Sequence, residues 1–191
     1  MHKHTRNLVL LALVGALGVA GCGSSKSNAG STTTPSTTAP AGGHVAIPVK
    51  ATPSTSAKMI CEKDVQSEIY GLVGVQVTAP LSPSWKDHVY SCKYVYANGT
   101  MTLSVKELAD KAQTDAYFAS LAAKLHKTKP IQSLGQGAFT TKNESAVVRK
   151  DYKVLTVDVS GLPPMFGAPP EPRGNVALDV SAEIMSCWTG A

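Results

Sequence analysis

Four cysteines are the residues of this 191-residue chain whose chemistry the sequence constrains most: Cys22, Cys61, Cys92 and Cys187. A cysteine sulfur can act as a nucleophile that accepts a covalent group, or it can pair with a second sulfur in a disulfide. Cys22 stands directly after an apolar run and before a tract of Ser, Thr and Pro, whereas the other three lie in sequence typical of a folded domain. We therefore expect Cys22 to do different chemistry from the others.

The residues before Cys22 resemble the bacterial lipobox, because VAGC at 19–22 has a branched apolar residue and two small residues before the cysteine. In that pattern the sulfur receives a diacylglycerol and the signal peptide is cut just before it. The apolar run 8–19 follows a positive start and is shorter than the roughly 20 residues of a membrane-spanning helix. We predict a lipoprotein signal peptide over 1–21 and lipidation of Cys22. A single-pass anchor is the alternative.

Residues 22–58 are predicted to be the lipidated cysteine and a disordered linker, because Ser, Thr, Pro, Gly and Ala dominate them and no apolar periodicity appears. As a flexible coil this linker would span roughly 30–36 Å root-mean-square. It could carry O-linked sugars or be a bare spacer. The predicted location is the extracytoplasmic side of the cell membrane, where acyl chains on Cys22 hold the protein.

Charge argues against nucleic acid as a partner. Cleavage after residue 21 would remove Lys3 and Arg6, which lowers the formal net charge from +5 to +3. No Lys/Arg cluster and no basic-aromatic stripe is expected in the mature chain. The moderately high pI therefore does not indicate nucleic-acid binding. The remaining charge is interpreted as a mildly basic, solvated surface, with a weak attraction to anionic lipid or wall polymer as the alternative.

The rest of the chain, 59–191, is predicted to be one globular α+β domain. We expect an antiparallel sheet with helices on one face, built as tandem α-β-β units plus a C-terminal helix. Asn98-Gly99 is a strong hairpin signal. The predicted elements are a helix over 61–73, hairpin strands over 88–97 and 100–108, a helix over 107–126, strands over 139–141, 145–149 and 153–160, a Pro-rich loop over 162–173, and a helix over 175–188.

These elements suggest a pairing for two of the remaining cysteines. Export to an oxidising compartment permits disulfides. Cys61 opens the first predicted helix and Cys92 lies on the first strand, so packing of that helix on the hairpin favours a Cys61–Cys92 disulfide, although sequence alone does not fix connectivity. Cys187 would then be the odd thiol. It is either a redox or intermolecular cysteine, or a small buried apolar residue of the last helix.

Aromatic residues suggest a ligand face. Tyr90, Tyr94 and Tyr96 share one side of a strand with Cys92, which could be a ligand floor or ordinary packing under a helix. Met165 and Phe166 place large apolar side chains in the Pro-rich loop. These two could form a contact tip or lid, or could pack onto the core.

Catalytic constellations are missing from the sequence. It has no Walker-type loop, HExxH, CxxC, calcium-loop spacing or GxSxG, and GQG at 135–137 precedes a strand, which favours a turn. His44, His88 and His126 are scattered in the chain. We therefore predict no catalytic residues, no metal site and no cofactor.

Several segments resemble a family of small actinobacterial (mycobacterial-type) lipoproteins that carry a domain of unknown function. The resemblance covers roughly residues 60–161, through CEKDVQSEIYGLVG, YSCKYVY with the turn ANGT, LGQGAF and AVVRKDYKVLTVDVSG. The family implies surface anchoring and commonly a disulfide between the helix cysteine and the strand cysteine, which here are Cys61 and Cys92. It implies no established catalysis.

The predicted function is therefore a membrane-anchored, non-catalytic binding or interaction module of the cell envelope, whose partner is an envelope protein or a wall component. The alternative is a carrier or sensor of a small apolar ligand, held between helices and sheet at the tyrosine face. An enzyme, such as a wall hydrolase, is disfavoured because no nucleophile–base or acid pair is visible in the sequence.

Overall fold

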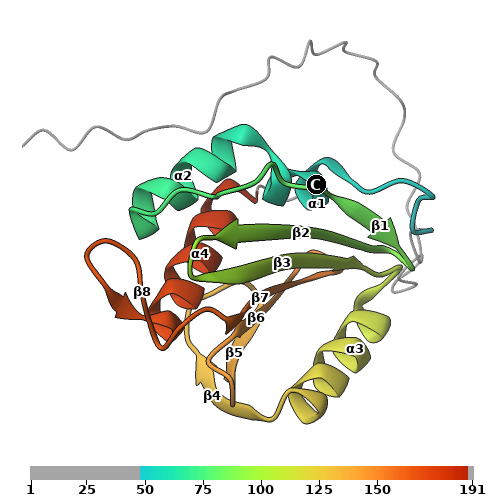
Figure 1. The fold of residues 1–191 in the computed structure, drawn as a ribbon. Coiled ribbons are helices and arrows are strands. Elements are labelled where there is room, and N and C mark those ends of the chain that lie inside the picture. The colour runs from blue at the N-terminus through green and yellow to red at the C-terminus, as the bar shows by residue number, and fades with distance from the viewer. Residues whose placement is uncertain (1–47, 189–191) are drawn as a thin grey trace, which may run out of the picture. The chain divides into compact units, whose positions relative to one another are not determined.

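A seven-stranded antiparallel sheet organises the protein, in the order β1-β2-β3-β7-β6-β5-β4 (Figure 1). The computed structural model describes residues 48–188, which lie within one compact unit, Pro40–Ala191. The predicted α+β class with an antiparallel sheet is confirmed. The strands of this sheet are β1 Ser84–Lys86, β2 Val89–Tyr96, β3 Gly99–Glu107, β4 Lys127–Ile131, β5 Gly137–Thr141, β6 Ala146–Lys150 and β7 Lys153–Gly161.

Helices and two short strands complete the described part. Strands β8 Met165–Phe166 and β9 Glu171–Pro172 pair with each other inside the predicted Pro-rich loop. The helices are α1 Thr55–Lys58, the 3₁₀ helix Met59–Cys61, α2 Lys63–Val73, α3 Lys111–Lys124 and α4 Arg173–Cys187. Within 48–188, no helix is both long enough and apolar enough to cross a membrane.

Strand β2 shows how alternation creates the core. Tyr90, Cys92, Tyr94 and Tyr96 are buried while Lys93 is exposed, because successive side chains of a strand point to opposite faces. The β2–β3 register places Tyr96 opposite Gly99, so the turn is residues 97–98 and the predicted hairpin is confirmed. Its glycine begins the second strand rather than completing the turn.

Helices α2 and α4 cover one face of the sheet, as predicted. Val65, Ile69 and Val73 of α2 share a buried cluster with Val180 and Ile184 of α4 and with the inward residues of the central strands. Figure 1 shows α2 and α4 next to each other at the upper left, away from α3. Repetition of these residues at helical spacing gives each helix an apolar face that the sheet buries.

Helix α3 covers the opposite face, which differs from the expectation that all helices share one face. Leu121 packs with Phe139 of β5, Val147 of β6 and Val154 of β7 in a second, separate cluster. These three strand residues alternate with neighbours that point to the α2–α4 side. The sheet is therefore apolar on both faces at β5–β7, and each face needs its own helical cover.

The structure also corrects the start of α3, which was predicted over 107–126. Asp110 caps the helix, because its side chain accepts a hydrogen bond from the backbone N–H of Gln113 at 2.7 Å. Glu107 instead ends β3 and lies opposite Lys153 of β7. The segment 127–131, for which no strand was predicted, forms the edge strand β4.

The predicted linker over 22–58 extends too far toward the C-terminus. Within the described residues, the segment 48–58 packs on the domain: Ala57 is fully buried, and the Ala51 carbonyl accepts a hydrogen bond from the Trp85 indole N–H at 2.7 Å. The boundary predicted at residue 59 therefore moves to residue 48 or earlier. The predicted signal peptide, Cys22 and the first part of the linker lie outside the described residues.

Candidate functional site

The predicted tyrosine face is part of the packed core. The Tyr94 hydroxyl donates a hydrogen bond to the Ile60 carbonyl at 2.8 Å, which ties β2 to the 3₁₀ helix above it. Tyr96 packs edge-to-face against Phe166, with ring centroids 4.8 Å apart. Phe166 is buried while its neighbour Met165 is 52% exposed, so the two loop residues predicted to act together point to different environments.

Burial raises the pKa of the Tyr94 and Tyr96 phenols, and the nearby Tyr96 adds a smaller effect at Tyr94. Both phenols are therefore neutral at physiological pH. A groove of about 370 Å³ borders these two residues beside α2. The side chains predicted as a ligand floor thus fill the space between β2 and its helical cover, as ordinary core packing does.

We predict that Tyr94→Phe will lower the free energy of unfolding by about 1–2 kcal/mol, because it leaves the buried Ile60 carbonyl without its donor. Tyr96→Phe is the matched control. Its hydroxyl is buried and has no hydrogen-bond partner among the described residues, so its removal should cost nothing or stabilise the protein. Urea unfolding followed by tryptophan fluorescence measures both. Equal losses in the two variants would contradict the prediction.

The predicted Cys61–Cys92 disulfide is present. It joins the 3₁₀ helix to β2 with a Cα–Cα distance of 5.6 Å. Cys187 is not a free thiol either. This differs from the expectation of an odd thiol at Cys187. It also removes Cys187 as a thiolate ligand, although its sulfur lies close to the carboxylates of Glu68 and Glu183.

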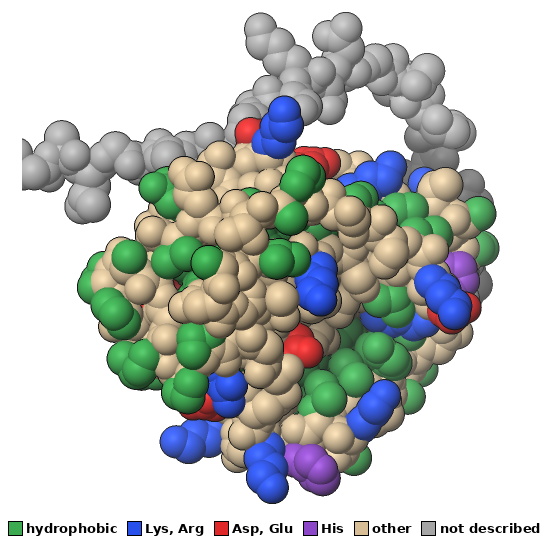
Figure 2. Space-filling model, viewed as in Figure 1, with side chains coloured by type: hydrophobic (Ala, Val, Ile, Leu, Met, Phe, Trp, Pro, Cys, Tyr) green, Lys and Arg blue, Asp and Glu red, His purple; other side chains and the backbone are tan. Residues whose placement is uncertain are grey.

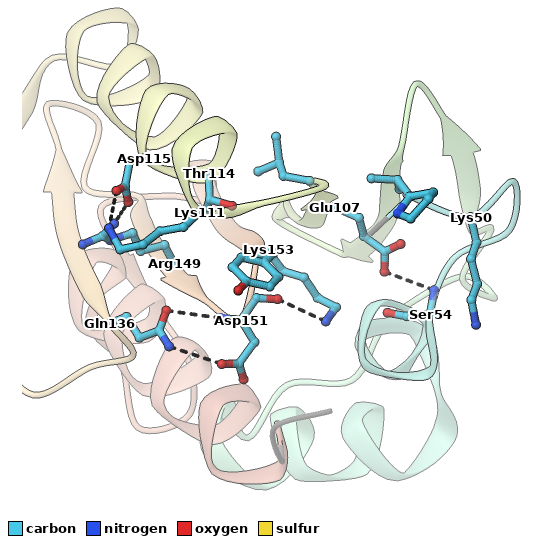
Figure 3. Close-up of a pocket in the computed structure, with 14 residues that line it drawn as sticks. Lys50, Ser54, Glu107, Lys111, Thr114, Asp115, Gln136, Arg149, Asp151 and Lys153 are labelled. Carbon is cyan, nitrogen blue, oxygen red and sulfur yellow. Dashed lines mark hydrogen bonds and ion pairs between the residues drawn. The ribbon is translucent and has the colours of Figure 1, made fainter. Parts of the chain in front are cut away.

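A cleft of about 700 Å³ lies elsewhere, where three segments far apart in the sequence meet (Figure 3). One wall is the approach segment 48–54, which the sequence had assigned to the linker. A second wall is the start of α3 with the end of β3. The third is the β6–β7 turn, in which Asp151 and Tyr152 have positive φ values of 49° and 59°. We call this space the approach cleft.

Two sets of charges line the approach cleft. At one end Asp115 of α3 forms ion pairs with Arg149 of β6 and, at 2.5 Å, with Lys111. Figure 3 shows both cations reaching toward this carboxylate from the same side. Arg149 also lies over the Phe118 ring, 5.4 Å from its centroid. This end is therefore largely neutralised within the protein and holds α3 against β6.

The other end of the approach cleft has charges that are less completely paired. Glu107 is only 7% exposed, and its Oε1 accepts a hydrogen bond from the Ser54 N–H at 3.1 Å. Lys153 lies opposite it in the β3–β7 register, and its Nζ donates to the Asp151 carbonyl at 3.4 Å. Asp151 Oδ1 accepts from the Gln136 amide at 3.2 Å, while its Oδ2 is buried without a partner among the described residues.

This arrangement suits binding of a ligand more than bond-breaking. Leu108, Tyr152 and the alkyl part of Lys153 supply apolar surface, while Glu107 and Lys153 present opposite charges from adjacent strands. Pockets that combine apolar walls with a few fixed polar groups are typical of small-molecule sites. Each carboxylate of the cleft is engaged by a donor of its own.

Sequence reasoning did not find the approach cleft. Glu107 and Lys153 are unremarkable until β3 and β7 pair, and no local motif predicts that pairing. Glu107 and Asp110 fall at the start of the predicted helix over 107–126, where negative charge favours the helix dipole. The structure instead buries Glu107 at the end of a strand.

The structure also brings together lysines that were not expected to cluster. Lys127 of β4 lies opposite Thr141 of β5, and the N–H of Lys142 donates to the Leu125 carbonyl at the end of α3 at 3.4 Å. The backbone therefore places the end of α3, the edge strand and the β5–β6 turn side by side. This placement differs from the expectation that the mature chain has no Lys/Arg cluster.

Comparison of the chain with protein-family models, with curated proteins and with solved structures finds no match.

Proposed function

We propose that this chain is a membrane-anchored extracytoplasmic lipoprotein whose folded domain is a non-catalytic binding module of the cell envelope. The approach cleft is the single observation that carries the binding function. Its opposite charges, Glu107 and Lys153, lie beside apolar walls in one space of about 700 Å³. The location rests on the VAGC pattern at 19–22 and on the short apolar run that precedes it.

The ligand that fits this cleft has charged groups of both signs beside an apolar part, as a short peptide does. A ligand ammonium would be attracted by the Glu107 carboxylate, and a ligand carboxylate by the Lys153 ammonium. Leu108 and Tyr152 would contact the apolar side chain. Such a ligand could be a wall peptide or a segment of an envelope protein, and both are reachable from a membrane tether.

Binding is tested with the full chain and a set of di- and tripeptides, by isothermal titration calorimetry. We expect Lys153→Met to weaken peptide binding at least tenfold, which corresponds to the loss of one charge-assisted contact. Lys93→Met is the matched control, because Lys93 is exposed on β2, outside the residues that line the cleft. The binding proposal fails if no peptide binds, or if both variants bind as the unchanged protein does.

Anchoring is tested by metabolic labelling with an alkyne fatty acid in a bacterial host. We expect the label on Cys22, the first residue of the mature chain, and none on the Cys22→Ser variant, because the side-chain sulfur is the acceptor. Residue-resolved mass spectrometry reads out the attachment. A thioether sulfur cannot also form a disulfide, so a mature protein with Cys22 in a disulfide or with an unmodified Cys22 would contradict the anchor.

A further inference from the structure

Positive charge gathers at one end of the domain. The stretch 116–143 contains no Asp or Glu, yet it includes four lysines and one histidine. All five side chains are exposed, and Figure 2 shows Lys/Arg and His side chains along the lower edge of the molecule, where α3 ends and β4 lies in Figure 1. We call this surface the basic edge; it consists of Lys124, His126, Lys127, Lys129 and Lys142.

Nearby acids do not neutralise the basic edge. Glu144, the next acid along the chain, pairs with the Arg173 Nε at 2.6 Å. Asp115, the acid before this stretch, is held by Lys111 and Arg149 at the other end of α3. None of the ion pairs between described residues includes a lysine of the basic edge. The Lys127 Nζ lies 5.8 Å from the centroid of the Phe139 ring, but no acid among the described residues neutralises these lysines.

Roles in folding explain only some of the lysines of the basic edge. Lys127, Lys129 and Pro130 lie on the edge strand β4, where lysine and proline prevent pairing with other chains. Lys124 is in the last turn of α3, where a cation favours the helix dipole. Neither role explains Lys142 in the β5–β6 turn, nor the absence of compensating acids around all four lysines.

We propose that the basic edge docks on the anionic phospholipid headgroups of the membrane to which the protein is tethered. This inference rests on the proposed lipid anchor. As a flexible coil, the part of the predicted linker before residue 48 would span roughly 25–30 Å and keep the domain within reach of the bilayer, so docking needs no search through solution. Each lysine near an anionic bilayer surface favours association by about fivefold, and four together by several hundredfold. The other edge of the sheet, β1, would then face away from the lipid.

The test uses the full lipidated protein, reconstituted into vesicles of phosphatidylcholine alone or of equal parts phosphatidylcholine and phosphatidylglycerol. Amide hydrogen exchange is measured for peptides that cover β4 and the β5–β6 turn. We expect exchange there to be several-fold slower on anionic vesicles than on neutral ones. The difference should vanish at high salt, because screening removes the attraction.

Two variants with equal net charge make the test specific. Replacing Lys124, Lys127, Lys129 and Lys142 together with Gln should abolish the slower exchange. The control replaces four other exposed lysines, Lys58, Lys63, Lys86 and Lys93, and should keep it. Loss of protection in both variants, or in neither, would overturn the proposal.

Two further measurements distinguish docking on lipid headgroups from loss of the anchor and from binding to a wall polymer. Flotation with neutral vesicles reports the lipid anchor alone, so an unanchored protein and an anchored but undocked protein give different results. A soluble phosphodiester polymer added to neutral vesicles tests a wall polymer as the partner. Protection by the polymer equal to that by anionic vesicles would overturn the assignment to lipid.

Discussion

Replacing Cys61 with serine is expected to lower the free energy of unfolding by about 3–4 kcal/mol. The disulfide joins residues that are 31 positions apart, and the chain-entropy model gives that value for a closed loop of this length. The bond also fixes the 3₁₀ helix on β2, next to the hydrogen bond from the Tyr94 hydroxyl to Ile60. Urea unfolding under non-reducing conditions measures the loss.

The control for this prediction is the double variant Cys61→Ser/Cys92→Ser. It removes the same cross-link but leaves no buried thiol, and Cys92 is completely buried in the unchanged protein. We expect the double variant to lose about as much stability as the single one. A loss below about 1 kcal/mol in both would show that the unfolded chain is already compact around these residues.

Local patterns predicted those parts of the fold that short-range physics determines. Residues 89–96 alternate between buried positions and positions that are half-buried or exposed, because the pleat of a strand alternates, so the alternating pattern predicted the hairpin. The Cys61–Cys92 disulfide was predictable for a related reason. A helix that precedes a hairpin in the sequence commonly packs on that hairpin, because the connection between them is short. In both cases the partners are close in the sequence.

The remaining features depend on contacts between distant residues. The sequence around Glu107 favours a helix, because Leu108 and Ala112 continue the apolar stripe of α3. Pairing of β3 with β7 outweighs that preference and holds Glu107 in a strand, opposite Lys153. The approach cleft follows from the same pairing and from the packing of 48–54. Tertiary contacts of this kind leave no local signature in a single sequence.

Segment 48–54 illustrates how composition alone can mislead. Its Pro, Thr and Ser residues are typical of a linker. The Ser54 side chain nevertheless accepts a hydrogen bond from the Ala57 N–H and begins α1, and the Ser54 N–H donates to buried Glu107. A Ser/Thr-rich segment that ends in a helix cap is therefore better interpreted as the first part of the folded domain than as linker.

Replacing Phe139 with alanine is expected to cost about 3–5 kcal/mol of unfolding free energy, as truncation of a buried aromatic residue does. Phe139 is completely buried and packs edge-to-face with Phe118 of α3, at a ring-centroid distance of 4.9 Å. It belongs to the smaller of the two clusters, which holds α3 on its face of the sheet together with the Asp115–Arg149 ion pair. A cavity there has few other side chains to fill it.

This substitution should affect α3 and the approach cleft more than the other helices. Because α3 carries Lys111 and Asp115 into the approach cleft, we expect Phe139→Ala to speed amide exchange in α3 and to weaken peptide binding, while exchange in α2 and α4 changes less. Phe139→Leu is the control, since it keeps most of the volume and should lose clearly less stability. Equal acceleration in all three helices would instead show that the two faces of the sheet unfold as one unit, and that the cover formed by α3 has no independent stability.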